Sequence, residues 1–219
     1  MRIDVIFDTV CPWCYIGKKR LEAAIASHGG DAIEIHWNAF LLNPDIPTDG
    51  MDRRAYLRAK FGGEARAQRV YAAIARAGIS AGIEFNFDAI DWTPNTIDSH
   101  RFVRYAQQLG KGAEAVERVF QSYFLEGRDI GDRSVLVDIG AELGFITDRL
   151  DAYLDDTSTI QNILDHNARA HRLGISGVPA FIVDGQFSIS GAQEPAVIGR
   201  LLDVARERQR ELLAGEVTG

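Results

Sequence analysis

The feature that most constrains this sequence is its pair of cysteines, Cys11 and Cys14, which lie three residues apart and are the two cysteines of the chain. They follow an apolar run at 3–7 and precede an amphipathic stretch at 15–25. A strand, a C-x-x-C motif and a helix in this order are typical of a thiol–disulfide redox site. The unpaired N–H groups and partial positive charge of a helix N-terminus stabilise a thiolate, so the first cysteine is the expected nucleophile.

The residues around the cysteines weaken two other interpretations. Pro12 suits the first turn of a helix, where its missing N–H removes no helical hydrogen bond. A zinc site needs about four ligands, but the sequence has no second cysteine pair, and His166 and His171 are poorly spaced for one helix face. We therefore expect no metal. Two structural cysteines also fit poorly, because a Pro-Trp pair fills the motif at a strand–helix junction.

Composition and charge exclude several classes of protein. The chain has 219 residues, of which 46% are hydrophobic and 25% charged, as is ordinary for a globular protein. Its formal net charge of −7 argues against nucleic acid or an anionic membrane surface as partner. No stretch approaches the roughly 18 apolar residues of a membrane span, and no signal-peptide pattern opens the sequence. We expect a cytoplasmic protein, and in that reducing compartment a lone cysteine pair is more often catalytic than structural.

The beginning of the chain has a β-α-β pattern. Hydrophobic periodicity predicts strands at 3–7 and 32–40, with a helix at 11–27 between them. Gly29 and Gly30 are expected to end that helix.

The rest of the chain changes character twice. From 51 to 173 the pattern is helical, without a convincing strand. The end returns to short strands at 180–183 and 186–189. Asp184-Gly185 between these strands is a strong hairpin signal, and a final helix follows. The predicted fold class is α/β, with a sheet that a helical block interrupts.

Several stretches together carry a resemblance to a known family. They are 7–17 around the cysteines, Asn95-Thr96 with His100-Arg101, 177–181 around Pro179, and 184–187 with 190–193. Over nearly its whole length the chain resembles the DsbA-like thioredoxin-fold oxidoreductases, and specifically their cytoplasmic FrnE-like branch. Trp13 departs from the periplasmic relatives, which carry histidine there. Some FrnE-like proteins have a second cysteine pair; this chain has none, which excludes regulation by a second disulfide.

The resemblance implies a thioredoxin-like fold (β-α-β … β-β-α) that is split by an all-helical insertion. We assign 1–43 and 174–219 to the thioredoxin-like domain and 44–173 to the insertion. The insertion contains no cysteine, so it cannot exchange thiols and would instead shape the choice of substrate.

The two cysteines receive different roles. Cys11, nearer the helix N-terminus and solvent, is expected to attack a substrate disulfide, and Cys14, one turn further in, to resolve the mixed disulfide. Trp13 cannot donate a charged hydrogen bond to the Cys11 sulfur, so the helix N-terminus has to supply more of the thiolate stabilisation. Trp13 equally suits an apolar rim that contacts substrate.

Residues elsewhere are expected to support the pair. The resemblance implies a cis peptide bond at Pro179, placed against the cysteines. The backbone of Val178 would then pair with an extended substrate segment beside the disulfide. Asp8, three residues before Cys11, is either a proton acceptor for the Cys14 thiol or a turn-forming residue.

The insertion holds candidate substrate contacts. Asn95 suits the N-cap of a helix that begins near 96. We expect His100 and Arg101 at the mouth of the cleft, with a packed helix histidine as the alternative for His100. Three aromatic residues of an irregular segment either line the cleft or pack in the core: Phe85, Phe87 and Trp92.

These residues lead to a primary hypothesis and two alternatives. The primary hypothesis is a thiol–disulfide oxidoreductase that uses its CPWC dithiol to reduce, isomerise or form disulfides in protein, peptide or small-thiol substrates. It needs no cofactor beyond the cysteine pair, and glutathione is a candidate co-substrate. A cytosolic glutathione potential of roughly −220 to −320 mV would keep the dithiol mostly reduced, which favours reduction or isomerisation.

The first alternative is a glutathione-dependent isomerase or kappa-class transferase, for which the resemblance implies a serine in place of Cys11. The second is a chaperone that binds extended peptides in the same cleft without redox chemistry. The sequence leaves the physiological substrate, the electron partner and the oligomeric state open.

Overall fold

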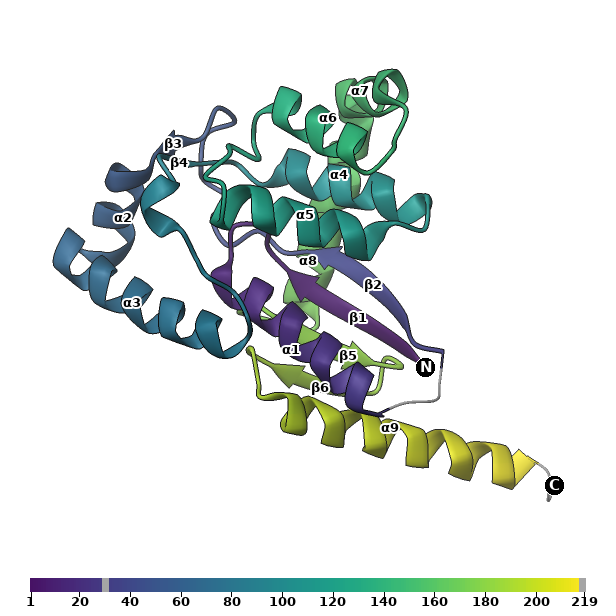
Figure 1. Cartoon of the computed structure of the whole chain (residues 1–219). Helices are drawn as coiled ribbons and strands as arrows, with labels where there is room; N and C mark the ends of the chain where they lie inside the picture. The colour runs from purple at the N-terminus through teal and green to yellow at the C-terminus, as the bar shows by residue number, and fades with distance from the viewer. Residues whose placement is uncertain (29–31, 217–219) are drawn as a thin grey trace.

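The structure is a computed structural model that describes residues 1–28 and 32–216 (Figure 1). Its centre is a four-stranded sheet in the order β2-β1-β5-β6. The strands are β1 (Arg2–Phe7), β2 (Glu34–Ala39), β5 (Ala180–Val183) and β6 (Phe187–Ser190). β1 runs parallel to β2 and antiparallel to β5, so the first strand of the chain lies in the middle of the sheet. The predicted helix end at Gly29 and Gly30 lies outside the described residues.

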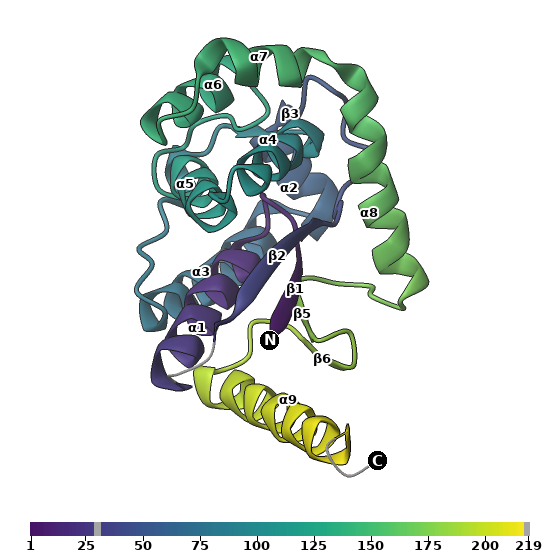
Figure 2. The ribbon, with the colours of Figure 1, turned by 90° about the vertical axis from the view of Figure 1, so that its right-hand side faces the viewer.

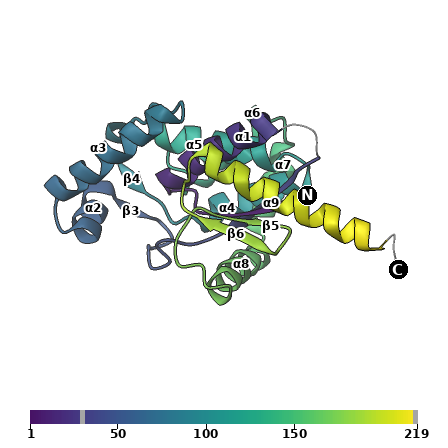
Figure 3. The ribbon, with the colours of Figure 1, turned by 90° about the horizontal axis from the view of Figure 1, so that it is seen from below.

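Helices cover both faces of the sheet (Figures 2 and 3). α1 (Pro12–His28) and α9 (Pro195–Glu216) lie together on one face, and α8 (Ile160–Arg172) lies on the other, beside β2. α1 and α9 pack closely, since a Cβ added at Gly199 would come within 2.1 Å of the His28 Cε1. This layered arrangement is the thioredoxin-like fold that the sequence predicts.

Between β2 and α8 the chain is predominantly helical, as predicted. The helices are α2 (Arg53–Phe61), α3 (Glu64–Ser80), α4 (Ile97–Gln108), α5 (Gly112–Phe124), α6 (Arg133–Glu142) and α7 (Thr147–Asp155), with the 3₁₀ turns η1 (Phe87–Ala89) and η2 (Thr157–Thr159). The prediction of an all-helical insertion is wrong in one respect. β3 (Met51–Asp52) and β4 (Trp92–Thr93) pair as a short antiparallel ribbon. Strands of two residues are too short to produce a readable alternation of apolar and polar residues.

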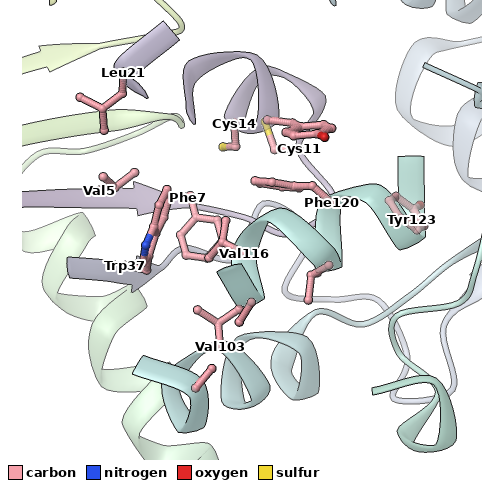
Figure 4. Close-up of a cluster of buried hydrophobic side chains, with 14 of the residues drawn as sticks. Val5, Phe7, Cys11, Cys14, Leu21, Trp37, Val103, Val116, Phe120 and Tyr123 are labelled. Atoms are coloured by element: carbon pink, nitrogen blue, oxygen red, sulfur yellow. The ribbon is translucent and has the colours of Figure 1, made fainter. Parts of the chain in front are cut away.

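The largest hydrophobic cluster joins the sheet to the helical insertion (Figure 4). The ring of Phe7 in β1 lies 5.2 Å from that of Trp37 in β2 and 6.1 Å from that of Phe120 in α5. Val103 of α4 and Val116 of α5 belong to the same cluster. Full burial of one valine or phenylalanine side chain stabilises a fold by about 1.5–3 kcal/mol. The thioredoxin-like part and the insertion therefore share one core.

Candidate active site

The cysteine pair lies where a short loop connects β1 to α1. The carbonyl of Cys11 accepts the N–H groups of Cys14 at 2.9 Å and Tyr15 at 3.3 Å. Its own N–H donates to the Asp8 carbonyl at 3.0 Å, which closes the loop. Cys11 is thus the residue before the first turn of α1, at the end that carries the partial positive charge. Figure 4 shows both cysteines beside this end of the helix.

Both cysteines are free thiols and largely buried, with Cys11 5% and Cys14 2% exposed. Burial raises the pKa of the Cys14 thiol well above its ordinary value, and the neighbouring Cys11 sulfur and the Asp8 charge act in the same direction. Cys14 therefore keeps its proton at neutral pH. Trp13 is 39% exposed beside them, as suits a rim residue, whereas Pro12 is buried.

A loop from the far end of the chain completes the site. The peptide bond between Val178 and Pro179 is cis. The Val178 carbonyl lies 3.8 Å from the Cys11 sulfur, within hydrogen-bond reach of the thiol. Pro179 packs on α1 at Gly17, where an added Cβ would come within 2.8 Å of the Pro179 Cγ. The Pro179 carbonyl accepts the N–H of Gly191 at 2.7 Å, which holds the loop against the end of β6.

Asp8 lies fully buried at the end of β1. Its Oδ2 accepts the Leu42 N–H at 2.8 Å, and its Oδ1 lies 3.3 Å from the His100 Nε2. Together with the bond from its carbonyl to Cys11, these contacts make Asp8 a residue that holds the loop. Its charge nevertheless contributes to the raised pKa of Cys14. The role of proton acceptor stays a prediction.

A buried pair of hydroxyls, which the sequence does not predict, fixes the same loop to α4. Thr9 and Ser99 lie 2.7 Å apart through their hydroxyl oxygens. Since the Ser99 hydroxyl donates to the Thr96 carbonyl at 2.9 Å, Thr9 is the donor in the shared bond. No sequence signal could have found this pair, because its members are 90 residues apart and only folding brings them together.

Neither His100 nor Arg101 stands at the mouth of the cleft: that prediction is wrong for Arg101, and His100 is the packed helix histidine that was its alternative. His100 is 2% exposed and packs edge-on against Phe7, with ring centroids 5.0 Å apart. Arg101 is buried as well, and it donates to the Thr159 hydroxyl at 2.6 Å and to the carbonyls of Tyr153 and Asp156 at 2.9 and 2.8 Å. These acceptors lie inside the insertion, so the Arg101 guanidinium makes its hydrogen bonds there and not at the surface.

Asn95 also has structural contacts that account for its position. Its Oδ1 accepts the Ile97 N–H at 3.0 Å, and its Nδ2 donates to the Ile46 carbonyl at 2.8 Å. α4 itself begins at Ile97 with Thr96 before it, so Asn95 stabilises the helix start from one position further out than predicted.

Across 1–28 and 32–216, no group of three or more His, Cys, Asp or Glu side chains is arranged to hold a metal ion. No helix in this part of the chain is long and apolar enough to cross a membrane.

The fold and the site define a thioredoxin-fold protein with a dithiol at the start of its first helix and a cis proline beside it. The family model of the DSBA-like thioredoxin domain matches residues 2–203. The chain therefore belongs to this family.

Individual proteins agree with this assignment. The uncharacterized protein YwbO of Bacillus subtilis (strain 168) is 30% identical over 195 residues, which are 88% of this chain and 90% of that protein. The structure of a probable DsbA oxidoreductase, SCO1869 from Streptomyces coelicolor, is 27% identical with a TM-score of 0.86, covering 94% of this chain and 90% of that one. The cytosolic disulfide reductase DsbM from Pseudomonas aeruginosa shares the fold, with 22% identity and a TM-score of 0.65 over 98% of this chain and 100% of that one. Membership of the FrnE-like branch stays a prediction.

Proposed function

We propose that this protein is a dithiol–disulfide oxidoreductase in which Cys11 attacks the substrate and Cys14 resolves the mixed disulfide. One observation carries the proposal: Cys11 lies at the N-terminus of α1, and its sulfur is 3.8 Å from the Val178 carbonyl. The helix terminus favours negative charge on sulfur. The raised pKa of Cys14 leaves that residue protonated while Cys11 reacts.

The reaction balances over two exchanges. The Cys11 thiolate attacks one sulfur of the substrate disulfide, a Cys11–substrate bond forms, and the other substrate sulfur leaves as a thiolate that takes up a proton. Cys14 then gives up its proton, attacks the Cys11 sulfur and releases the second substrate thiol. Two molecules of a small thiol such as glutathione reduce the resulting Cys11–Cys14 disulfide and become one disulfide themselves. The reverse sequence forms a disulfide in a dithiol substrate.

The surroundings of the pair support an extended substrate. The Val178 carbonyl offers an acceptor beside the reacting sulfur, as in the addition of a short strand to a sheet edge. Trp13 is exposed next to the pair, and Val10 and Leu42 are partly buried hydrophobic residues of the neighbouring loops. Peptide and small-molecule disulfides both suit such a surface.

The test compares Cys11→Ser and Cys14→Ser in the reduction of insulin and of glutathione disulfide. Cys11→Ser should lose activity, whereas Cys14→Ser should accumulate a mixed disulfide that appears in the intact mass and disappears with dithiothreitol. Faster alkylation of Cys14 than of Cys11 would reverse the two roles. A variant with both cysteines replaced that retained its function in cells would favour the peptide-binding chaperone.

A further inference from the structure

A buried arginine lies outside the thiol chemistry. Arg53, the first residue of α2, is 6% exposed. Its guanidinium donates to the Tyr71 hydroxyl at 2.7 Å and reaches the hydroxyls of Thr93 at 3.4 Å and Tyr123 at 3.5 Å. Its Nε has no hydrogen-bond partner. Within the described ranges, no carboxylate lies at ion-pair distance from this guanidinium.

The lack of an anionic neighbour is unusual for a buried charge. Removing an ion from water is costly unless an opposite charge and hydrogen bonds compensate. The phenol rings of Tyr71 and Tyr56, with centroids 5.1 and 5.6 Å from the Arg53 guanidinium carbon, offset part of the cost. A carboxylate would offset far more, because it accepts two parallel, charge-assisted hydrogen bonds from a guanidinium.

Arg53 lines a cavity of about 800 Å³ that also has aromatic walls. Tyr71, Phe87 and Trp92 contribute these walls, and Trp92 remains partly exposed. Four acidic residues line the same cavity, Asp52, Glu64, Asp88 and Asp91, together with a second arginine, Arg54. The four carboxylates outnumber the two arginines, so the cavity as a whole would repel a ligand that is only anionic. A ligand with both a carboxylate and an ammonium group matches the buried cation and the acidic lining at once.

Tyr56 lies between Arg53 and the chain segment that contacts the cysteine loop. Its ring lies beside the Arg53 guanidinium, and its hydroxyl donates to the Asn43 Oδ1 at 3.2 Å. The preceding residue, Leu42, donates its N–H to Asp8. Burial raises the pKa of Tyr56 to about 12, and the charges of Asp8 and Cys11 contribute to that shift. Through these contacts Tyr56 joins the Arg53 guanidinium to the segment that binds Asp8 of the cysteine loop.

We propose that the Arg53 cavity binds the α-amino-acid head group of a small disulfide or thiol substrate. The carboxylate of the head group would bind the Arg53 guanidinium, and its ammonium group would lie against the acidic and aromatic lining. Cystine and glutathione disulfide both carry such a group. This inference rests on the proposed function for its substrate class, and it makes the selection of small substrates a property of the helical insertion.

Small disulfides that differ in charge provide the first test. The unmodified protein should reduce cystine or glutathione disulfide with a higher kcat/KM than it shows for dithiodipropionate (carboxylates only), cystamine (ammonium groups only) or hydroxyethyl disulfide (neither). A preference for cystine over glutathione disulfide, or the reverse, identifies the source of the head group. Equal kcat/KM for all five would overturn the inference.

Variants then assign the preference to the cavity. In Arg53→Lys and Arg53→Met, the ratio of kcat/KM for glutathione disulfide over that for hydroxyethyl disulfide should fall by about tenfold, the expected effect of losing one strong charge-assisted contact. Asp88→Asn should lower the ratio of kcat/KM for cystamine over kcat/KM for hydroxyethyl disulfide. Arg66→Gln, at an exposed position of α3 outside the cavity lining, is the matched control and should change neither ratio.

A binding measurement separates this inference from the proposed reaction. S-methylglutathione has no free thiol and can be titrated calorimetrically into the variant with Cys11→Ser and Cys14→Ser. Binding that is lost on adding Asp88→Asn or Arg53→Lys supports the head-group site even if the protein proves unable to reduce disulfides. No binding at millimolar concentration, or binding that these variants leave unchanged while circular dichroism shows them folded, would overturn it.

Discussion

At the scale of single residues, the raised pKa of Cys14 predicts how the second exchange depends on pH. Because Cys14 is protonated at neutral pH, its thiolate fraction, and with it the rate of resolution, should rise about tenfold per pH unit below that pKa. Single-turnover release of the second substrate thiol between about pH 6 and pH 9 measures this rate. A resolution rate that does not change with pH would mean that another group already holds the Cys14 proton, for which Asp8 is the candidate.

Gly17 gives a second prediction at this scale. In Gly17→Ala the new Cβ would lie 2.8 Å from the Pro179 Cγ and 3.2 Å from the Phe181 Cζ, so α1 or the Pro179 loop has to move. Overpacking of this kind costs about 1–3 kcal/mol, and thiol exchange should slow because Val178 moves with the loop. Gly177→Ala is the control, since an added Cβ there meets nothing within 4 Å. Urea unfolding of both variants gives the comparison, and equal stabilities would contradict the predicted contact.

Some of the site residues could be predicted from the sequence, and others could not. Cys11 and Cys14 were identifiable because their geometry is local: three residues of spacing and a helix start define it. The positions of His100 and Arg101 depend on which partners the fold supplies, and those partners lie 92 residues from His100 and up to 58 from Arg101. The sequence around His100 and Arg101 does not show which distant residues the fold brings into contact with them.

At the scale of elements, Arg101 is expected to stabilise the insertion rather than to act on substrate. It links α4 to η2 and the end of α7 through Thr159, Tyr153 and Asp156. Arg101→Met leaves several acceptors unpaired in a buried place. We expect unfolding free energy to fall by about 3 kcal/mol, with the redox potential of the cysteines moving by less than about 30 mV.

Arg149→Met is the matched control for this prediction, because Arg149 lies exposed on α7. Chemical denaturation and equilibration with glutathione buffers give the two quantities. A large shift of the potential in Arg101→Met, without loss of stability, would place the arginine in the electrostatics of the sulfurs instead.

Helices and strands can be predicted from the sequence where their periodic pattern is long or where a turn signal marks their end. The hairpin between β5 and β6 was predicted from Asp184-Gly185, and both residues have positive φ, 49° and 69°. Asp132, a residue type that favours the N-cap, caps α6, since its side chain accepts the Ser134 N–H. Short polar residues follow one another around the starts of α7 and α8, so the sequence does not single out one cap there. Ile146, whose side chain makes no capping hydrogen bond, precedes α7, and Asp156 caps a 3₁₀ turn before α8.

At the scale of the whole molecule, the shared core makes the insertion part of the folding unit. The sequence predicts two parts from a change of periodicity, but periodicity does not show whether two parts pack separately. Phe120 of α5 is fully buried, stacks on Tyr15 of α1 with ring centroids 4.9 Å apart, and contacts Phe7 of β1. Tyr15, the residue that follows Cys14, therefore packs against the insertion.

This arrangement predicts that the protein unfolds in one cooperative transition, and that a cavity in the insertion destabilises the active-site helix as much as the insertion itself. Phe120→Ala should lower the unfolding free energy by about 3–5 kcal/mol. Tryptophan fluorescence, to which Trp13 and Trp37 contribute from the thioredoxin-like part, and far-UV circular dichroism should report the same midpoint in urea, before and after the substitution. Leu109→Ala, a deletion of similar chemistry at a 53% exposed position, should cost less than about 0.5 kcal/mol. Two separated midpoints in Phe120→Ala, with fluorescence unchanged, would show that the sheet and the helical insertion fold as independent units.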